Sequence, residues 1–152
     1  MKVTVLIDNL PHQGSLVTEH GLSLLIQSNA GTVLFDTGAS AAYMDNAKKM
    51  GIDLRAVERV VLSHAHYDHT GGLEAFLEWN TRAEVWVKEG FMAPKFKKDR
   101  YIGLPWADYP LERFRFLSGS SEVLPGLMAV TEIPLRFPED AHFRDFFTGE
   151  GE

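Results

Sequence analysis

The chain has 152 residues, of which 45% are hydrophobic and 24% charged, a composition typical of one globular domain and not of a disordered segment. Its formal net charge of −6 leaves no general basic surface, which argues against nucleic acid as a partner. The chain has no cysteine, so any metal site has to be built from imidazole, carboxylate and water.

The first third of the chain predicts three strands. Residues 2–7 begin as an alternating pattern and become fully apolar, as expected of a first strand. Residues 21–28 and 32–35 flank the turn sequence at 29–31, which predicts a hairpin. No segment has the length of a membrane span or the pattern of a leader peptide, so we expect a cytoplasmic protein that does not enter a membrane.

A helix is predicted next, from a cap at Ser40 to about Met50, where Gly51 gives the usual C-terminal stop. The apolar run at 60–62 is continuous, as in a strand that is buried on both faces. Apolar residues then recur at helical spacing over 73–77. The order is therefore strand, short loop, helix.

The remaining sequence predicts fewer elements. Residues 84–87 are predicted to form another strand, whereas 90–109 are expected to be irregular because of their proline, glycine and charge content. Residues 113–117 and 127–133 are interpreted as a hairpin around the turn at 118–121. The tail at 146–152 shows no pattern that would close a fold.

The loop after the 60–62 strand contains four potential metal ligands within six residues: His64, His66, Asp68 and His69. Residues two apart in extended backbone point to the same side, roughly 6.5 to 7 Å apart, so His64 and His66 can close on one ion. If the chain reverses at Tyr67, the other two can hold a second ion at about 3.5 to 4 Å from the first. The alternative, a solvated polar turn, is disfavoured by the strand and helix that flank the loop.

These residues form the HxHxDH pattern that marks the metallo-β-lactamase superfamily, and the chain resembles that family. The segments LFDTG (34–38), EHGLSLLI (19–26), NAKKMGIDL (46–54) and LSHAHYDHTGGL (62–73) are similar to its branch of 7,8-dihydropterin-6-methyl-4-(β-D-ribofuranosyl)aminobenzene-5'-phosphate synthase-like proteins. The resemblance implies an α+β fold, the αββα sandwich with a mixed sheet and flanking helices. Residues 1–152 would form a single truncated domain, the N-terminal half of that sandwich.

The resemblance also implies roles for the loop residues. His64 and His66 would bind a first metal, Asp68 and His69 a second, and Asp68 would act as general base where one metal is present. Zn²⁺ is the expected cofactor, as one or two ions, with Mn²⁺ or Fe²⁺ as alternatives. Asp36, at the end of a strand, is expected to accept the second ring proton of a metal-bound histidine, although a turn or helix-cap role is the alternative.

The family draws further ligands from motifs nearer the C-terminus, and no strand ending in a histidine follows residue 133. His142 is expected to be a surface histidine rather than a replacement ligand. The polar loop 12–20 could border the site, although a surface role is the simpler interpretation for His12 and His20.

The expected function is metal-dependent hydrolysis, in which a metal-bound hydroxide attacks a small substrate that can carry phosphate. The first alternative is a pterin-pathway transferase of the same fold. The second is an inactive truncated or split half that folds by association. Apart from the small-molecule substrate, the expected partner is therefore a second copy of the chain in a homo-oligomer, or a complementary C-terminal half.

Overall fold

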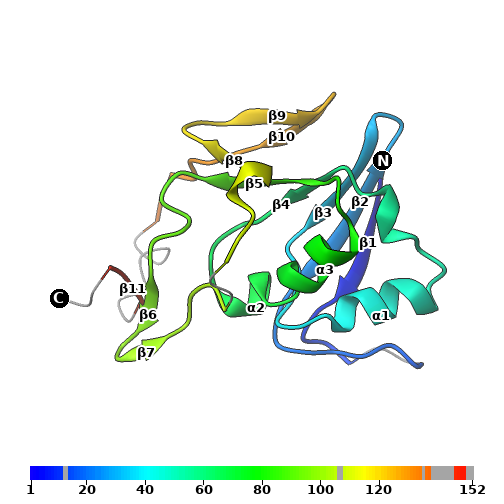
Figure 1. Cartoon of the computed structure of the whole chain (residues 1–152), viewed down its shortest axis with the longest axis horizontal. Coiled ribbons are helices and arrows are strands. Elements are labelled where there is room, and N and C mark those ends of the chain that lie inside the picture. Colours follow the sequence, from blue (N-terminus) through cyan, green and yellow to red (C-terminus); the bar gives the residue numbers. More distant parts are fainter. Residues whose placement is uncertain (12–13, 106–107, 135, 138–145, 150–152) are drawn as a thin grey trace.

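A six-stranded mixed sheet with helices on one face forms the centre of the fold (Figure 1). The computed structural model describes the whole chain except residues 12–13, 106–107, 135, 138–145 and 150–152. In spatial order, the first and third strands pair antiparallel with the second, and the third to sixth strands pair with one another in parallel. In spatial order the strands are β1 (Lys2–Ile7), β2 (Ser23–Ser28), β3 (Gly31–Phe35), β4 (Arg59–Val61), β5 (Glu84–Lys88) and β8 (Phe114–Leu117).

The strands predicted in the first third of the chain are confirmed. Strands β2 and β3 form the expected hairpin, in which Ser28 pairs with Gly31 across a two-residue loop. Gly31 has φ +144°, a backbone conformation that L side chains rarely adopt. Local turn chemistry was therefore sufficient to predict this part of the sheet.

Three helices lie on one side of the sheet: α1 (Ala42–Lys49), α2 (Tyr67–Thr70) and α3 (Leu73–Trp79). The predicted cap at Ser40 stands two residues before α1, where its Oγ accepts a hydrogen bond from Ala42 N at 3.1 Å. Single 3-10 turns occur at Leu54–Ala56 and Leu111–Arg113. The predicted helices are confirmed, with boundaries shifted by one or two residues.

The main core lies between the helices and the sheet. Its strand residues alternate with residues of the opposite face, because neighbouring side chains of a strand point to opposite sides. Each is at most 1% exposed: Leu25, Leu34, Val60 and Val85. Tyr43 of α1 and Phe76 of α3, both 0% exposed, pack in the same cluster.

The predicted hairpin of 113–117 with 127–133 is wrong. Strand β8 joins the main sheet in parallel beside β5, and the hairpin consists of β9 (Ser121–Leu124) and β10 (Leu127–Ala129). Pro125 and Gly126 form its turn, and Gly126 has φ +78°. This turn signal lies beside the serine-rich segment at 118–121, which carries the same kind of local signal but connects β8 to β9.

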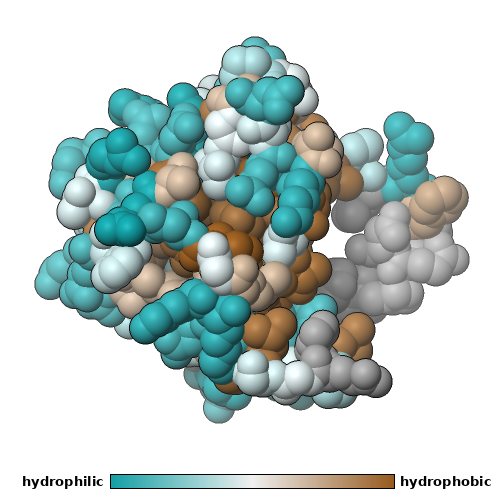
Figure 2. All heavy atoms as spheres, turned by 90° about the vertical axis from the view of Figure 1, so that its right-hand side faces the viewer, coloured by the Kyte–Doolittle hydropathy of each residue, from teal (hydrophilic) through white to brown (hydrophobic). Residues whose placement is uncertain are grey.

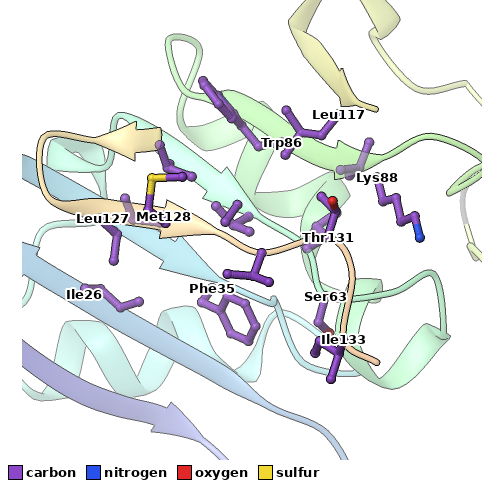
Figure 3. Close-up of a pocket in the computed structure, with 17 residues that line it drawn as sticks. Ile26, Phe35, Ser63, Trp86, Lys88, Leu117, Leu127, Met128, Thr131 and Ile133 are labelled. Atoms are coloured by element: carbon purple, nitrogen blue, oxygen red, sulfur yellow. The ribbon is translucent and has the colours of Figure 1, made fainter. Parts of the chain in front are cut away.

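The second face of the sheet is only partly covered, by this β9–β10 hairpin. Val33 and Val123 are buried between the two layers, whereas Val3 and Val5 of β1 remain 52% and 49% exposed. A cavity of about 370 Å³ lies between sheet and hairpin (Figure 3). Figure 2 shows apolar residues gathered in a hollow of the surface. The prediction that 60–62 is buried on both faces is therefore wrong for the face that carries Val61, which is only half-buried.

A second, smaller sheet shows that two further expectations from the sequence are wrong. Strands β6 (Lys95–Lys97) and β7 (Arg100–Tyr101) form a short hairpin within the segment expected to be irregular. Its turn places Lys98 at φ +56°, a conformation that usually favours glycine or asparagine, so a lysine there does not predict a turn. Strand β11 (Phe146–Thr148) pairs with β6, so part of the tail is integrated into the fold.

Within the described part of the chain, no helix is both long and apolar enough to cross a bilayer.

Candidate metal centre

The HxHxDH loop lies at the carboxyl end of two adjacent parallel strands. Phe35 of β3 pairs with Val61 of β4, so the residues that follow these strands emerge at the same edge of the sheet. Asp36 follows β3, and Ser63 and His64 follow β4. The topology alone therefore brings a carboxylate to the base of the histidine loop.

The four predicted ligands lie together. His64, Asp68 and His69 can each offer one ligand atom so that all three atoms lie within 4.8 Å of one another, the one such group of three among the described residues. His66 is not part of this group, but its Nδ1 lies 3.0 Å from His64 Nε2. The ring centroid of His64 is 4.4 Å from that of His66 and 4.2 Å from that of His69. These are imidazole and carboxylate donors of the kind that bind zinc and related ions.

The buried carboxylate of Asp36 orients the ring of His69. Its side chain is 0% exposed; Oδ1 accepts a hydrogen bond from Ser63 N, and Oδ2 accepts from Ser63 Oγ and lies 2.7 Å from His69 Nδ1. Because a carboxylate only accepts, His69 carries its proton on Nδ1 and leaves the Nε2 lone pair free. This is the contact expected of a metal-bound histidine.

The same carboxylate also sets the tautomer of His64 through Ser63. The Ser63 hydroxyl donates its hydrogen to Asp36, so its oxygen, 2.9 Å from His64 Nδ1, accepts from that nitrogen. His64 Nε2 is then unprotonated and faces His66 Nδ1. The two nitrogens are close enough for one ion at the usual zinc–nitrogen distance of about 2.0 to 2.1 Å to bind both. The residues present thus fit a divalent ion.

Two glycines allow the loop to lie against the segment after β3. A Cβ on Gly71 would lie 2.1 Å from Ala39 O, and a Cβ on Gly72 would lie 2.4 Å from Ser40 O. Backbone hydrogen bonds join the segments at this point, including one of 2.8 Å from Gly71 N to Gly38 O. Glycine is therefore required here for close approach of two backbones.

The surroundings shift the pKa values of His64 and His69 in opposite directions. Burial, with the nearby charges of His69 and His66, lowers the pKa of His64 to about 4. Burial also acts to lower the pKa of His69, but its hydrogen bond to Asp36 and the charges of Asp36 and Asp68 together raise it. A neutral imidazole is the form that binds a metal, so His64 needs no deprotonation at neutral pH.

These shifts predict two separate titrations in the metal-free chain. By NMR after chelator treatment, His64 should titrate near pH 4 and His69 above the ordinary 6.5. Because its folded-state pKa is lowered, His64 stabilises the fold above pH 6.5, and that contribution is lost as the pH falls toward 4. His69 stabilises below 6.5 and loses that contribution as the pH rises through its raised pKa. A His64→Ala chain identifies the low titration, and two titrations near 6.5 would contradict this assignment.

The structure adds two residues near the site that the sequence predicted only weakly or not at all. His20 Nε2 lies 3.4 Å from Asp68 Oδ2, and a cavity of about 340 Å³ adjoins both residues. Phe146 of β11 stacks on His66, with ring centroids 5.4 Å apart. His20 lies in the EHGLSLLI segment, whose similarity to the family could have marked it as a site residue. His12 and His142 lie outside the described residues.

Comparisons with known proteins give the following similarities. The sequence model described as the metallo-beta-lactamase superfamily matches residues 17–149. The chain is 29% identical to the uncharacterized protein MJ0448 of Methanocaldococcus jannaschii over 103 residues. These residues are 67% of this chain and 40% of that protein. It is 39% identical over 61 residues, 37% of the chain, to that organism's 7,8-dihydropterin-6-methyl-4-(beta-D-ribofuranosyl)-aminobenzene-5'-phosphate synthase, 21% of whose length is covered.

A solved structure extends the likeness to nearly the whole chain. The crystal structure of Tm1679, described as a metal-dependent hydrolase of the beta-lactamase superfamily, superposes with a TM-score of 0.72 at 29% identity. The match covers 97% of this chain and 54% of Tm1679. The chain therefore spans about half the length of that protein, and less than half of the two curated relatives.

Proposed function

Because the chain belongs to the metallo-beta-lactamase superfamily, we propose that it supplies one side of a metal centre for the hydrolysis of a small substrate. The observation that carries this proposal is the hydrogen bonding of Asp36, which leaves Nε2 of both His64 and His69 without a proton in the neutral rings, near Asp68. His64 and His66 would hold one ion, and Asp68 and His69 a second. Zn²⁺ suits this donor set best, with Mn²⁺ or Fe²⁺ as alternatives, and the cytoplasm is the proposed location.

Bound metal ions would supply an acidified water as nucleophile at neutral pH and polarise the oxygen of the substrate. Where one metal is present, Asp68 would take up a proton as general base, because its side chain is 14% exposed and lines the cavity beside His20 and His69. Phe146 covers one face of the His66 ring, which limits the directions from which water reaches that ligand.

The centre proposed here includes ligands from a further polypeptide layer. Catalytic zinc sites generally keep about three protein ligands for each ion, and four donors shared by two ions fall short of that number. The partly covered apolar face of the sheet offers a place for such a layer, because Leu62 and Ser63, the residues that precede His64, line its cavity. Either a second copy of this chain or a complementary segment would fill this role.

The alternative activity is a transferase reaction on a phosphorylated pterin. The specific observation in its favour is the 39% identity, over 61 residues, to the dihydropterin-aminobenzene-phosphate synthase. Both activities would use the same metal centre to hold the substrate, and both are compatible with a substrate that carries phosphate.

Hydrolysis is tested with bis(p-nitrophenyl) phosphate and p-nitrophenyl acetate, using the purified chain with added Zn²⁺ or Mn²⁺. The wild-type rate is expected to exceed that of His64→Ala by about 10-fold or more, because loss of a ligand should cost at least as much as loss of an outer hydrogen-bond partner. Glu78→Ala, an exposed change on α3, serves as the control and should behave as wild type. Equal rates for wild type and His64→Ala with both metals would contradict the proposed hydrolase.

A further inference from the structure

The segment that carries His20 is fixed against the metal loop at several points. Leu22 N donates to Asp68 O at 3.3 Å. Gly21 has φ +153°, and a Cβ there would lie 2.3 Å from that same Asp68 oxygen. On the other side of His20, the Glu19 carboxylate accepts hydrogen bonds from Ala39 N and Ser40 N. The fold itself, rather than chance at the surface, therefore brings His20 to Asp68.

Asn9 determines which nitrogen of His20 carries the proton. Asn9 Oδ1 accepts a hydrogen bond of 2.9 Å from Gly21 N, which orients the amide and turns its Nδ2 toward His20 Nδ1 at 3.0 Å. An amide NH₂ group only donates, so His20 Nδ1 has to accept. In the neutral ring the proton then lies on Nε2, the nitrogen that faces Asp68 Oδ2.

We propose that His20 is a positioning residue for Asp68: its Nε2–H donates to the carboxylate and turns it toward the metal. The proposal rests on the proposed function, since it gives Asp68 a metal to face. The separation of 3.4 Å is longer than the usual 2.7 to 3.2 Å of a hydrogen bond. The His20 side chain is 67% exposed, which leaves the ring room to close that distance.

The same geometry argues against His20 as a metal ligand. Its Nδ1 lone pair is used by Asn9, and its Nε2 carries the proton, so neither nitrogen is free to bind an ion. The remaining role for His20 is to donate a hydrogen bond to Asp68. Metal-binding carboxylates are commonly oriented by such hydrogen bonds from residues that do not touch the metal.

The test compares His20→Ala with His20→Gln, whose amide can still donate to a carboxylate. Zn²⁺ and Co²⁺ affinities of the full chain are measured by competition with a chromophoric chelator, together with the visible spectrum of bound Co²⁺. His20→Ala should weaken the ion held by Asp68 by about 10-fold, with unchanged stoichiometry and an altered Co²⁺ spectrum, and His20→Gln should restore most of the affinity. Urea unfolding of each variant checks that the fold is intact.

Other outcomes overturn the proposal. Unchanged affinity in His20→Ala would remove the positioning role, and loss of one whole ion without rescue by His20→Gln would identify a ligand instead. Nitrogen NMR of the metal-free chain at pH 8 provides an arm that does not depend on metal. His20 should show the Nε2–H tautomer, and Asn9→Ala should weaken that preference. A Nδ1–H tautomer in the wild type would overturn the inference, whereas a wild-type chain that binds no metal but shows Nε2–H would contradict the proposed function alone.

Discussion

Replacing Gly71 by alanine is expected to lower the free energy of unfolding by about 3 kcal/mol or more, and to disorder the metal loop. The added Cβ would lie 2.1 Å from Ala39 O and 2.8 Å from Tyr67 O, and both of these atoms belong to the backbone. Neither segment can move away cheaply, because Gly71 N donates to Gly38 O at 2.8 Å and Thr37 N donates to His69 O at 2.7 Å. Relief of the clash would break the hydrogen bonds that align the ligands.

Urea unfolding of the metal-free chain measures this effect. Gly119→Ala is the matched control, because a Cβ there meets no heavy atom within 4 Å and the residue has no positive φ. The control should change the free energy of unfolding by no more than about 0.5 kcal/mol. Equal unfolding midpoints for the two variants would show that the close approach at Gly71 does not constrain the loop.

Replacing Asp36 by asparagine is expected to weaken metal binding by about 10- to 100-fold and to lower the free energy of unfolding by about 1 to 3 kcal/mol. The buried carboxylate accepts from Ser63 N and Ser63 Oγ and faces His69 Nδ1. An amide nitrogen in place of Oδ2 would face two donors and could accept from neither. His69 and, through Ser63, His64 would lose the groups that fix their tautomers.

Asparagine is the informative substitution because it preserves the backbone. Asp36 has φ +58°, a conformation that asparagine adopts more readily than most residues, so the variant isolates the loss of the carboxylate. Isothermal titration with Zn²⁺ gives the affinity. Ser63→Ala, which leaves the contact between Asp36 and His69 in place, should show a smaller loss. Wild-type affinity in Asp36→Asn would contradict the role assigned to this carboxylate.

Much of the fold could be predicted because its signals are local. The β2–β3 hairpin depends on one turn, and the order of strand, ligand loop and helix around residues 60–77 lies within a short stretch of sequence. The pairing of β8 with β5 depends on contacts between segments almost thirty residues apart. The turn signals at 118–121 and at Pro125-Gly126 were equally strong in the sequence, so composition could not decide which of them closes a hairpin.

The site also contains residues whose position could be predicted from the sequence and contacts that could not. Asp36 could be expected beside the loop, because it ends a strand in a fold where neighbouring parallel strands end together. The hydrogen bond between Ser63 and His64 and the one between Asn9 and His20 have directions that depend on how the side chains lie in three dimensions. No periodicity predicts which ring nitrogen receives a proton, so these contacts became visible only in the structure.

The metal content of the chain, purified without chelator, tests the central claim most directly. Elemental analysis of the wild type should find one or two ions of zinc, manganese or iron per chain, and His64→Ala should lose most of this metal. Glu78→Ala should retain it. Near-zero zinc, manganese and iron in the wild type, with the same behaviour in His64→Ala, would contradict the metal centre itself.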